Sequence, residues 1–170
     1  MAVLTQTEIL KRIKAGTIKI EPLNKSAIGP ASIDLHLDNQ FRVFKTTHQP
    51  YKVKGPVDYQ DITQLIIADK YFLLNPGQTA HGITIEKITL PDNICGWIEG
   101  RSSLGRLGLS VHITASFIQP GISNKQVLEM NNVGPIPLAI YPGIAVCQII
   151  LEETLGAAKY QGRFRHQHQP

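Results

Sequence analysis

Few of the features that mark membrane, secreted or disulfide-bonded proteins occur in this sequence. It has two cysteines in 170 residues, Cys95 and Cys147, and each stands alone in an apolar stretch, NICGWI and AVCQII. We therefore expect two reduced, buried thiols rather than a disulfide or a pair of metal ligands. No run of 18 apolar residues occurs, and the first residues, MAVLTQTEILKRIK, lack the apolar core of a signal peptide. These absences predict a cytoplasmic protein with no membrane partner.

A dense basic stripe, which is typical of nucleic-acid-binding proteins, is also missing. The 17 Lys and Arg residues against 13 Asp and Glu give a formal net charge of +4. These basic residues are scattered, except in the last eight residues, RFRHQHQP. We therefore expect a small polyanion rather than a nucleic acid as the partner, although charge alone would also fit a role in solubility.

The local sequence patterns predict one short helix followed by many strands. Thr5 and Glu8 have the spacing of a capping box, apolar residues follow at helical spacing, and Gly16 is a natural stop, so we expect a helix near residues 6–15. Residues 45–61 are polar and indicate a long loop or hairpin excursion. The remaining runs have strand-like patterns between turn signals, at 17–23, 31–38, 40–44, 71–80, 81–93, 94–100, 109–121, 125–132, 134–143 and 144–155.

This pattern predicts a mainly β fold: a sandwich, a barrel or a jelly roll. Neither an internal repeat nor a linker is present, so we expect a single domain over residues 1–170. The tail at 157–170 is polar and basic, and we expect it to be either disordered or ordered by a ligand.

The stretch IEGRSSLGRLGL, residues 98–109, combines two arginines, two serines and three glycines between apolar segments. Small residues allow backbone N–H groups to approach an anion, and Arg supplies forked donors for phosphate oxygens. The stretch is compatible with a phosphate site and equally with a Gly-rich turn carrying solvated arginines.

A single carboxylate interrupts the apolar run QVLEMNN. Strict alternation places Glu129 on the same face as Val127. A carboxylate on an apolar strand is costly to bury unless it is paired or used in chemistry, whereas a lone Glu on a half-exposed strand simply faces water.

Together these segments resemble a known family. EGRSSLGRLGL, VHITASFIQPG, QVLE and the tail YQGRFRHQ are similar to dCTP deaminases of the trimeric dUTPase superfamily, as are PASIDLHL and PGQTAHGITIEKITLP. The resemblance extends over nearly the whole chain. The spacing between RSSLGRLG and VLE, with Glu129 27 residues after Ser102, is the most specific part of it.

The resemblance implies a distorted β jelly roll that assembles as a homotrimer, with three active sites at the subunit boundaries. It implies hydrolysis of dCTP to dUTP and ammonia without zinc, with Mg²⁺ bound to the triphosphate. It further implies feedback inhibition by dTTP and a C-terminal tail that closes over the nucleotide.

The resemblance also implies roles for individual residues. Glu129 would be the catalytic carboxylate, and Ser102 and Arg106 would order it and the water. Val127 and Leu128 would present backbone groups to the base, and His112 and Ala115 would line the base pocket. The nucleotide-binding set would be Arg101, Ser102, Ser103, Leu104, Gly105, Arg106, Gln119, Val127, Leu128, Glu129, Gln148, Tyr160, Arg163 and Gln167.

The sequence lacks the motifs of zinc-dependent nucleotide deaminases, His-x-Glu and Pro-Cys-x-x-Cys. His112 lies in an apolar run, which favours a packed histidine with its hydrogen bonds satisfied over a metal ligand. His166 and His168 form an HxH pair with no third ligand near them in sequence. We therefore expect no metal site formed by the protein itself.

One position departs from the family pattern. Gln119 stands before Pro120-Gly121, where many relatives carry an aspartate that helps to activate the water for triphosphate cleavage. A glutamine amide cannot act as a general base near neutral pH. We therefore expect a deaminase that stops at dUTP. The alternatives are a bifunctional enzyme that forms dUMP and pyrophosphate, a dUTPase, or a nucleotide-binding trimer without catalysis.

Overall fold

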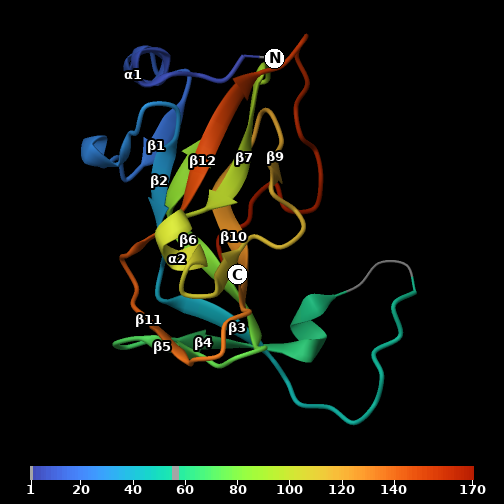
Figure 1. Cartoon of the computed structure of the whole chain (residues 1–170). Helices are drawn as coiled ribbons and strands as arrows, with labels where there is room; N and C mark the ends of the chain where they lie inside the picture. Colours follow the sequence, from blue (N-terminus) through green and yellow to red (C-terminus); the bar gives the residue numbers. More distant parts are fainter. Residues whose placement is uncertain (1, 55–57) are drawn as a thin grey trace.

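The computed structural model describes residues 2–54 and 58–170 and is built mainly from antiparallel strands (Figure 1). The helical elements are α1 Gln6–Lys14, η1 Lys25–Ala27, η2 Tyr59–Ile62 and α2 Ser102–Gly105. The strands are β1 Lys19–Glu21, β2 Ile33–His36, β3 Gln40–Phe44, β4 Thr63–Ile67, β5 Phe72–Leu74, β6 Thr79–Thr89, β7 Ile94–Gly100, β8 Leu109–Val111, β9 Phe117–Ile118, β10 Ser123–Asn132, β11 Leu138–Ile140 and β12 Ala145–Glu153. The expectation of a mainly β fold with a short N-terminal helix is confirmed.

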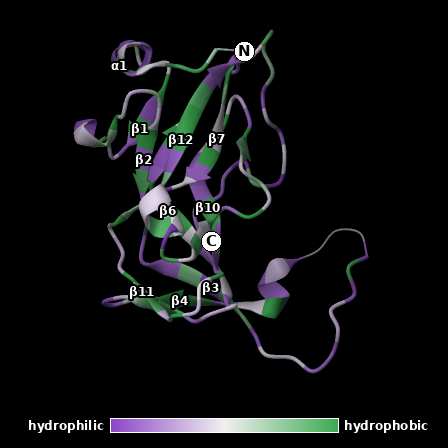
Figure 2. Ribbon diagram, in the orientation of Figure 1, coloured by the Kyte–Doolittle hydropathy of each residue, from purple (hydrophilic) through white to green (hydrophobic). Residues whose placement is uncertain are grey.

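Two larger sheets and a two-stranded sheet organise the chain. One larger sheet has the order β4-β3-β6-β10-β8, with β1 also paired to β6, and the other has the order β2-β12-β7-β9. The small sheet joins β5 and β11. Buried side chains of both larger sheets, such as Leu128 and Ile149, belong to one hydrophobic cluster. Polar and apolar residues both occur along β7 and β12, as expected for strands with one face on this core (Figure 2).

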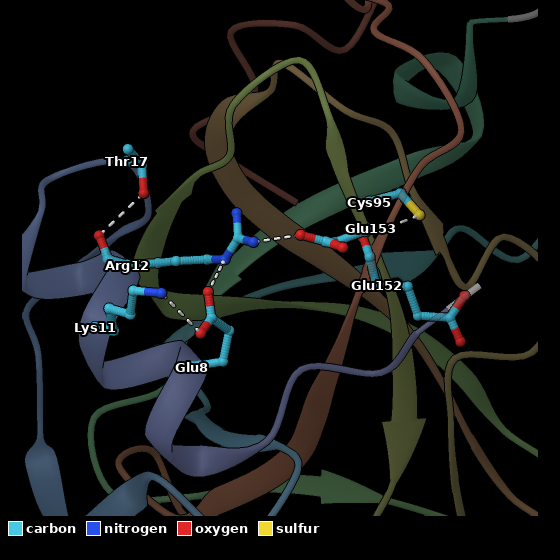
Figure 3. Close-up of polar contacts among 7 residues, drawn as sticks. All are labelled: Glu8, Lys11, Arg12, Thr17, Cys95, Glu152 and Glu153. Carbon is cyan, nitrogen blue, oxygen red and sulfur yellow. Dashed lines mark hydrogen bonds and ion pairs between the residues drawn. The ribbon is translucent and has the colours of Figure 1, made fainter.

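The helix α1 packs on the core through the buried Ile9 and is also tied to β12 by an ion pair, while the predicted capping box does not form. The Thr5 side chain makes no cap hydrogen bond. The Glu8 carboxylate instead accepts from Arg12 at 2.9 Å, and Arg12 also pairs with Glu153 at the end of β12 (Figure 3). The capping-box prediction is therefore wrong in detail, because the carboxylate that would complete the box is bound further along the helix.

The strand predictions are confirmed with three local differences. Residues 80 and 81, placed in separate runs, belong to the single long strand β6. The run at 109–121 is divided into β8 and β9 by a turn at 112–116. The edge strand β4 was not predicted, because TQLII does not alternate. In the predicted excursion at 45–61, η2 begins at Tyr59, and residues 55–57 lie outside the described part of the chain.

Both cysteines are free and buried, as expected. Burial raises the pKa of the Cys147 thiol, so this group stays protonated and acts as a small apolar side chain. No helix among the described residues is long and apolar enough to cross a membrane.

The backbone beside the arginine- and serine-rich stretch tolerates little change. Gly108 has φ +90°, and a Cβ there would lie 2.5 Å from the Gly134 Cα. We expect Gly108→Ala to lower the free energy of unfolding by at least about 2 kcal/mol, from left-handed strain plus overlap with backbone. Chemical denaturation measures this, and Gly105→Ala, where nothing lies within 4 Å of the new methyl group, is the matched control. Equal stabilities of the two variants would contradict the expectation.

Candidate active site

A cavity of about 410 Å³ opens beside the middle of β10. Its lining comes from η2, β6, β10, the segment 112–122 and the C-terminal tail. Among the residues predicted for the site, those that line it are His112, Ala115, Gln119, Val127, Glu129, Tyr160 and Gln167. Val127 and Glu129 share the half-exposed face of β10, as the alternation predicted, whereas Leu128 points into the core.

The carboxylate of Glu129 is held in place by Thr114. The Thr114 backbone N–H donates to Oε2 at 2.6 Å, and the Thr114 hydroxyl lies 2.8 Å from both carboxylate oxygens. The backbone also connects the two segments, because the His112 N–H donates to the Glu129 carbonyl at 2.8 Å. Glu129 is therefore an oriented carboxylate on a cavity wall, not a solvated side chain on an open strand.

We expect Thr114→Val to lower kcat for the reaction proposed below about tenfold or more, because hydrogen bonds to a charged group are worth about 1.5–3 kcal/mol. Steady-state kinetics measure the loss. Thr114→Ser retains the hydroxyl and is the matched control. A Thr114→Val enzyme with the kcat of the Ser variant would show that the hydroxyl does not position Glu129.

The turn that carries Thr114 is strained. Among the described residues, His112 is the one non-glycine residue with a positive φ, which is 69°. Its Nε2 lies 2.7 Å from the Ala115 carbonyl and must therefore donate, which leaves Nδ1 as an acceptor. Nδ1 is buried with no partner in the described part of the chain, so the expectation of a fully satisfied histidine is wrong. Strain and an unpaired buried nitrogen are features that persist at functional sites.

The C-terminal tail folds back along the domain (Figure 1), and three of its residues line the cavity. The Tyr160 N–H donates to the Pro120 carbonyl at 3.0 Å, and the Asn124 side chain donates to the Phe164 carbonyl at 2.8 Å. Near the end of the tail, Arg42 Nε donates to the Pro170 carbonyl at 2.5 Å. The tail thus contributes the cavity wall formed by Tyr160, Phe164 and Gln167.

The arginine- and serine-rich stretch lies elsewhere on the chain. None of residues 101–106 is among the described residues that line the cavity. Ser102, Ser103, Gly105 and Arg106 are exposed on and beside α2, while Leu104 packs against the core. Within the described part of the chain, neither Ser102 nor Arg106 hydrogen-bonds to Glu129.

Three further predicted residues lie outside the cavity: Arg101 and Gln148 flank this stretch, and Arg163 belongs to the tail. Arg101 pairs with Asp34 of β2 at 3.1 Å, and Gln148 Nε2 lies 3.4 Å from the Gly100 carbonyl. Arg163 lies 3.7 Å from Asp58 and over the Phe164 ring. One chain therefore divides the predicted site residues between the cavity and the α2 surface.

Sequence reasoning missed several residues of the cavity region, and three of them bear on Glu129. Thr114, which holds Glu129, follows the strained turn, and no local pattern identifies it. His81 comes from β6, and only the pairing of β6 with β10 brings it to Glu129. Tyr59 comes from η2 and lies against the His81 ring. Among the described residues no group of three or more His, Cys, Asp or Glu side chains could hold a metal ion.

Comparison with known proteins identifies the family. The family model described as dCTP deaminase-like matches residues 3–154. The chain belongs to the dCTP deaminase-like family. It is 39% identical to "dCTP deaminase, dUMP-forming" of Parafrankia sp., over 98% of this chain and 87% of that protein. It is 41% identical to "dCTP deaminase, dUMP-forming" of Methanosphaera stadtmanae, over 89% of this chain and 79% of that protein. The expectation of an enzyme of this family is confirmed.

Solved structures agree on the fold. The 2'-deoxycytidine 5'-triphosphate deaminase of Agrobacterium tumefaciens superposes with a TM-score of 0.71 at 19% identity, over 89% of this chain. This chain spans about half of that one, 48%. A mutant dUTPase from phage phi11 of S. aureus superposes with a TM-score of 0.53 at 12% identity, covering 86% of this chain and 97% of that one. The dUTPase-like fold is therefore confirmed.

The same relatives correct the predicted product. Both curated relatives are named as dUMP-forming, whereas Gln119 predicted a deaminase that stops at dUTP. That prediction is wrong. Its physical error was to treat one side chain as the sole source of a base, although other proton acceptors line the same cavity as Gln119.

Proposed function

We propose that this chain converts dCTP and two waters into dUMP, pyrophosphate and ammonia. The observation that carries the proposal is the Glu129 carboxylate, fixed by Thr114 on the wall of the cavity. The names of the relatives at 39% and 41% identity support both the substrate and the product.

Deamination requires a nucleophilic water at C4 of cytosine. A positioned carboxylate can accept one proton of that water as its oxygen bonds to C4. The same group can return protons to the ring nitrogen N3 and to the departing amine. Glu129 is suited to this role because Thr114 fixes both of its oxygens on the wall of the cavity. His112 and Ala115 would line the base pocket, and Val127 and Leu128 would offer backbone groups to the pyrimidine edge.

The second half-reaction cleaves the triphosphate. Water attacks the α-phosphorus, and the bond to the bridging oxygen breaks with release of pyrophosphate. Mg²⁺ would be held by the triphosphate oxygens, since hard oxygen ligands suit it and the described residues offer no acidic cluster. Arg101, Ser103, Gln148, Tyr160, Arg163 and Gln167 would contact the phosphates, and Gln119 could hydrogen-bond to the sugar hydroxyl.

The division of the site supports a homotrimer with shared active sites. Ser102, Ser103 and Arg106 are exposed on the α2 surface, away from their own cavity. Apolar rings are also exposed, because Trp97 and Phe117 pack at a tilt with their ring centroids 4.8 Å apart and more than a third of each residue exposed. We propose that the α2 surface of one subunit completes the cavity of its neighbour, so that Ser102 and Arg106 reach a Glu129 on another chain. We also propose that each subunit of this trimer is the distorted jelly roll that the family resemblance implies.

Regulation by dTTP and closure of the tail follow from the same proposal. Because dTTP lacks the cytosine amino group, it would occupy the same cavity without being deaminated and would inhibit by competing with dCTP. The tail at 157–170 already forms one wall of the cavity and would close over the bound triphosphate.

A substrate panel tests the proposed function. Ammonia release is measured with dCTP, CTP, dCDP and dCMP at equal concentration with Mg²⁺, and the nucleotide products are separated by ion exchange. We expect rapid ammonia release from dCTP and dUMP as its nucleotide product. Equal rates with dCMP would contradict a site that uses the triphosphate, and an absence of ammonia from all four would contradict deamination.

A further inference from the structure

His81 is a titratable side chain on the cavity wall that the steps above do not use. It lies in β6, and its Cα is paired directly with Glu129 of β10 on one side and with Arg42 of β3 on the other. Residues paired across neighbouring antiparallel strands point to the same face of the sheet. His81 therefore shares the cavity face with the catalytic carboxylate.

The imidazole of His81 is held by rings but not by hydrogen bonds. The Phe44 and Tyr59 rings lie edge-on to it, with centroids 5.4 Å and 5.9 Å away. No hydrogen bond to either ring nitrogen forms among the described residues. Among the described residues, the side-chain atom that is both buried and without a partner is His112 Nδ1. The unpartnered nitrogens of His81 are therefore not buried, and they face the open space of the cavity that His81 lines. A water molecule in the cavity can reach them.

The surroundings of His81 favour the neutral imidazole. Burial lowers its pKa from the ordinary 6.5 as the largest effect, Glu129 opposes this, and the Arg42 cation lowers the pKa further. The groups facing His81 from packed elements are Glu129 from β10, Arg42 from β3 and the Tyr59 phenol from η2. At neutral pH the imidazole therefore has a free lone pair and can accept a proton.

Other residues of the cavity do not meet this need. Gln119 is an amide and cannot accept a proton from water. Glu129 is already assigned to deamination. His112 Nδ1 is sealed from solvent, and its Nε2 is occupied by the Ala115 carbonyl. A phenol oxygen is a weak proton acceptor, which argues against Tyr59 and Tyr160.

We propose that His81 is the general base of the triphosphate-cleaving half-reaction, a proposal that rests on the function proposed above. The oxygen of a water molecule bonds to the α-phosphorus of dUTP while its proton passes to a free nitrogen of His81. The bond from the α-phosphorus to the bridging oxygen breaks, and the electron pair leaves with pyrophosphate. The imidazolium then releases its proton to solvent when the products depart. The balance is dUTP plus water to dUMP plus pyrophosphate.

The test separates the two half-reactions in His81→Gln. Ammonia and pyrophosphate are measured with dCTP, and pyrophosphate alone with dUTP, for the wild type, His81→Gln and the control His48→Gln, whose residue is exposed in a loop outside the cavity. We expect His81→Gln to lose at least about 100-fold in pyrophosphate release, as for removal of a general base. Ammonia release from dCTP should remain within a few fold of the wild type, with dUTP accumulating.

The outcomes distinguish the two proposals. A wild-type enzyme that releases ammonia but no pyrophosphate contradicts the dUMP-forming function itself. A wild-type enzyme that forms dUMP overturns the role of His81 if His81→Gln releases pyrophosphate at an unchanged rate. Equal losses of ammonia release and pyrophosphate release in His81→Gln would also overturn the role of His81 as the base for triphosphate cleavage.

A wild-type pH profile tests the role without any variant. The base must be unprotonated, so kcat/KM for pyrophosphate release from dUTP should fall tenfold per pH unit below the pKa of His81. Because that pKa is lowered, the fall should begin below pH 6.5. A profile whose acid-side fall begins above pH 6.5 would overturn the proposal, even if the variants failed to fold.

Discussion

Glu129→Gln is expected to abolish ammonia release while leaving the nucleotide bound. The amide has nearly the shape of the carboxylate and can still accept hydrogen bonds from Thr114 through its oxygen. It cannot accept a proton from water, so the rate should fall by at least about 100-fold, the lower end of general base catalysis. Ammonia release from dCTP measures the loss, and isothermal titration with dCTP measures binding.

The matched control for Glu129→Gln is Glu99→Gln. Glu99 is an exposed carboxylate of β7 outside the cavity, and its replacement removes the same charge. More than a tenth of wild-type activity in Glu129→Gln would contradict its role as the base. If the wild type and Glu129→Gln both bound dCTP and neither turned it over, the chain would be a nucleotide-binding relative without catalysis.

Two inactive variants are expected to restore activity when they assemble together. Glu129→Gln keeps the α2 surface intact, and Arg106→Ala keeps the cavity intact. In a randomly mixed trimer, a shared site needs an intact Glu129 from one chain and an intact Arg106 from its neighbour. Every trimer that holds both variants has one such site among its three, so the purified mixed assemblies should show about one third of wild-type activity. Arg106 is exposed in the single chain, so its replacement should not disturb folding.

The measurement uses co-expression of the two variants with different affinity tags and sequential purification of mixed assemblies. Ammonia release is compared with that of each variant alone. If one chain built the whole site, every site in the mixture would carry one of the two defects and no activity would return. That result would contradict the shared-site proposal, even with the trimer confirmed by light scattering.

The parts of the fold that were predicted depended on local patterns. Helix α1 and most strands follow from spacing within a few residues, and Glu129 was placed correctly beside Val127 by alternation. The edge strand β4 was missed because an edge strand with little burial need not alternate. The capping box at Thr5 was wrong because the Glu8 carboxylate binds Arg12 instead of the Thr5 backbone.

The parts of the site that were missed depend on long-range geometry. Thr114 reaches Glu129 across 15 residues and a turn that requires a positive φ at His112. His81 is opposite Glu129 in a register that a β-bulge between Lys125 and Val127 sets. A one-residue slip would turn His81 to the other face, and no local pattern fixes that choice. The wrong product expected from Gln119 has the same origin, because single positions do not show which other bases share a cavity.

The most direct measurement is the ratio of pyrophosphate to ammonia during a time course with dCTP and Mg²⁺. Both products are quantified in the same samples from the first turnovers onward, and the nucleotides are separated by ion exchange. We expect pyrophosphate and ammonia in equal amounts, with dUMP as the nucleotide product and no accumulation of free dUTP. Ammonia accompanied by accumulating dUTP and no pyrophosphate would contradict the dUMP-forming function.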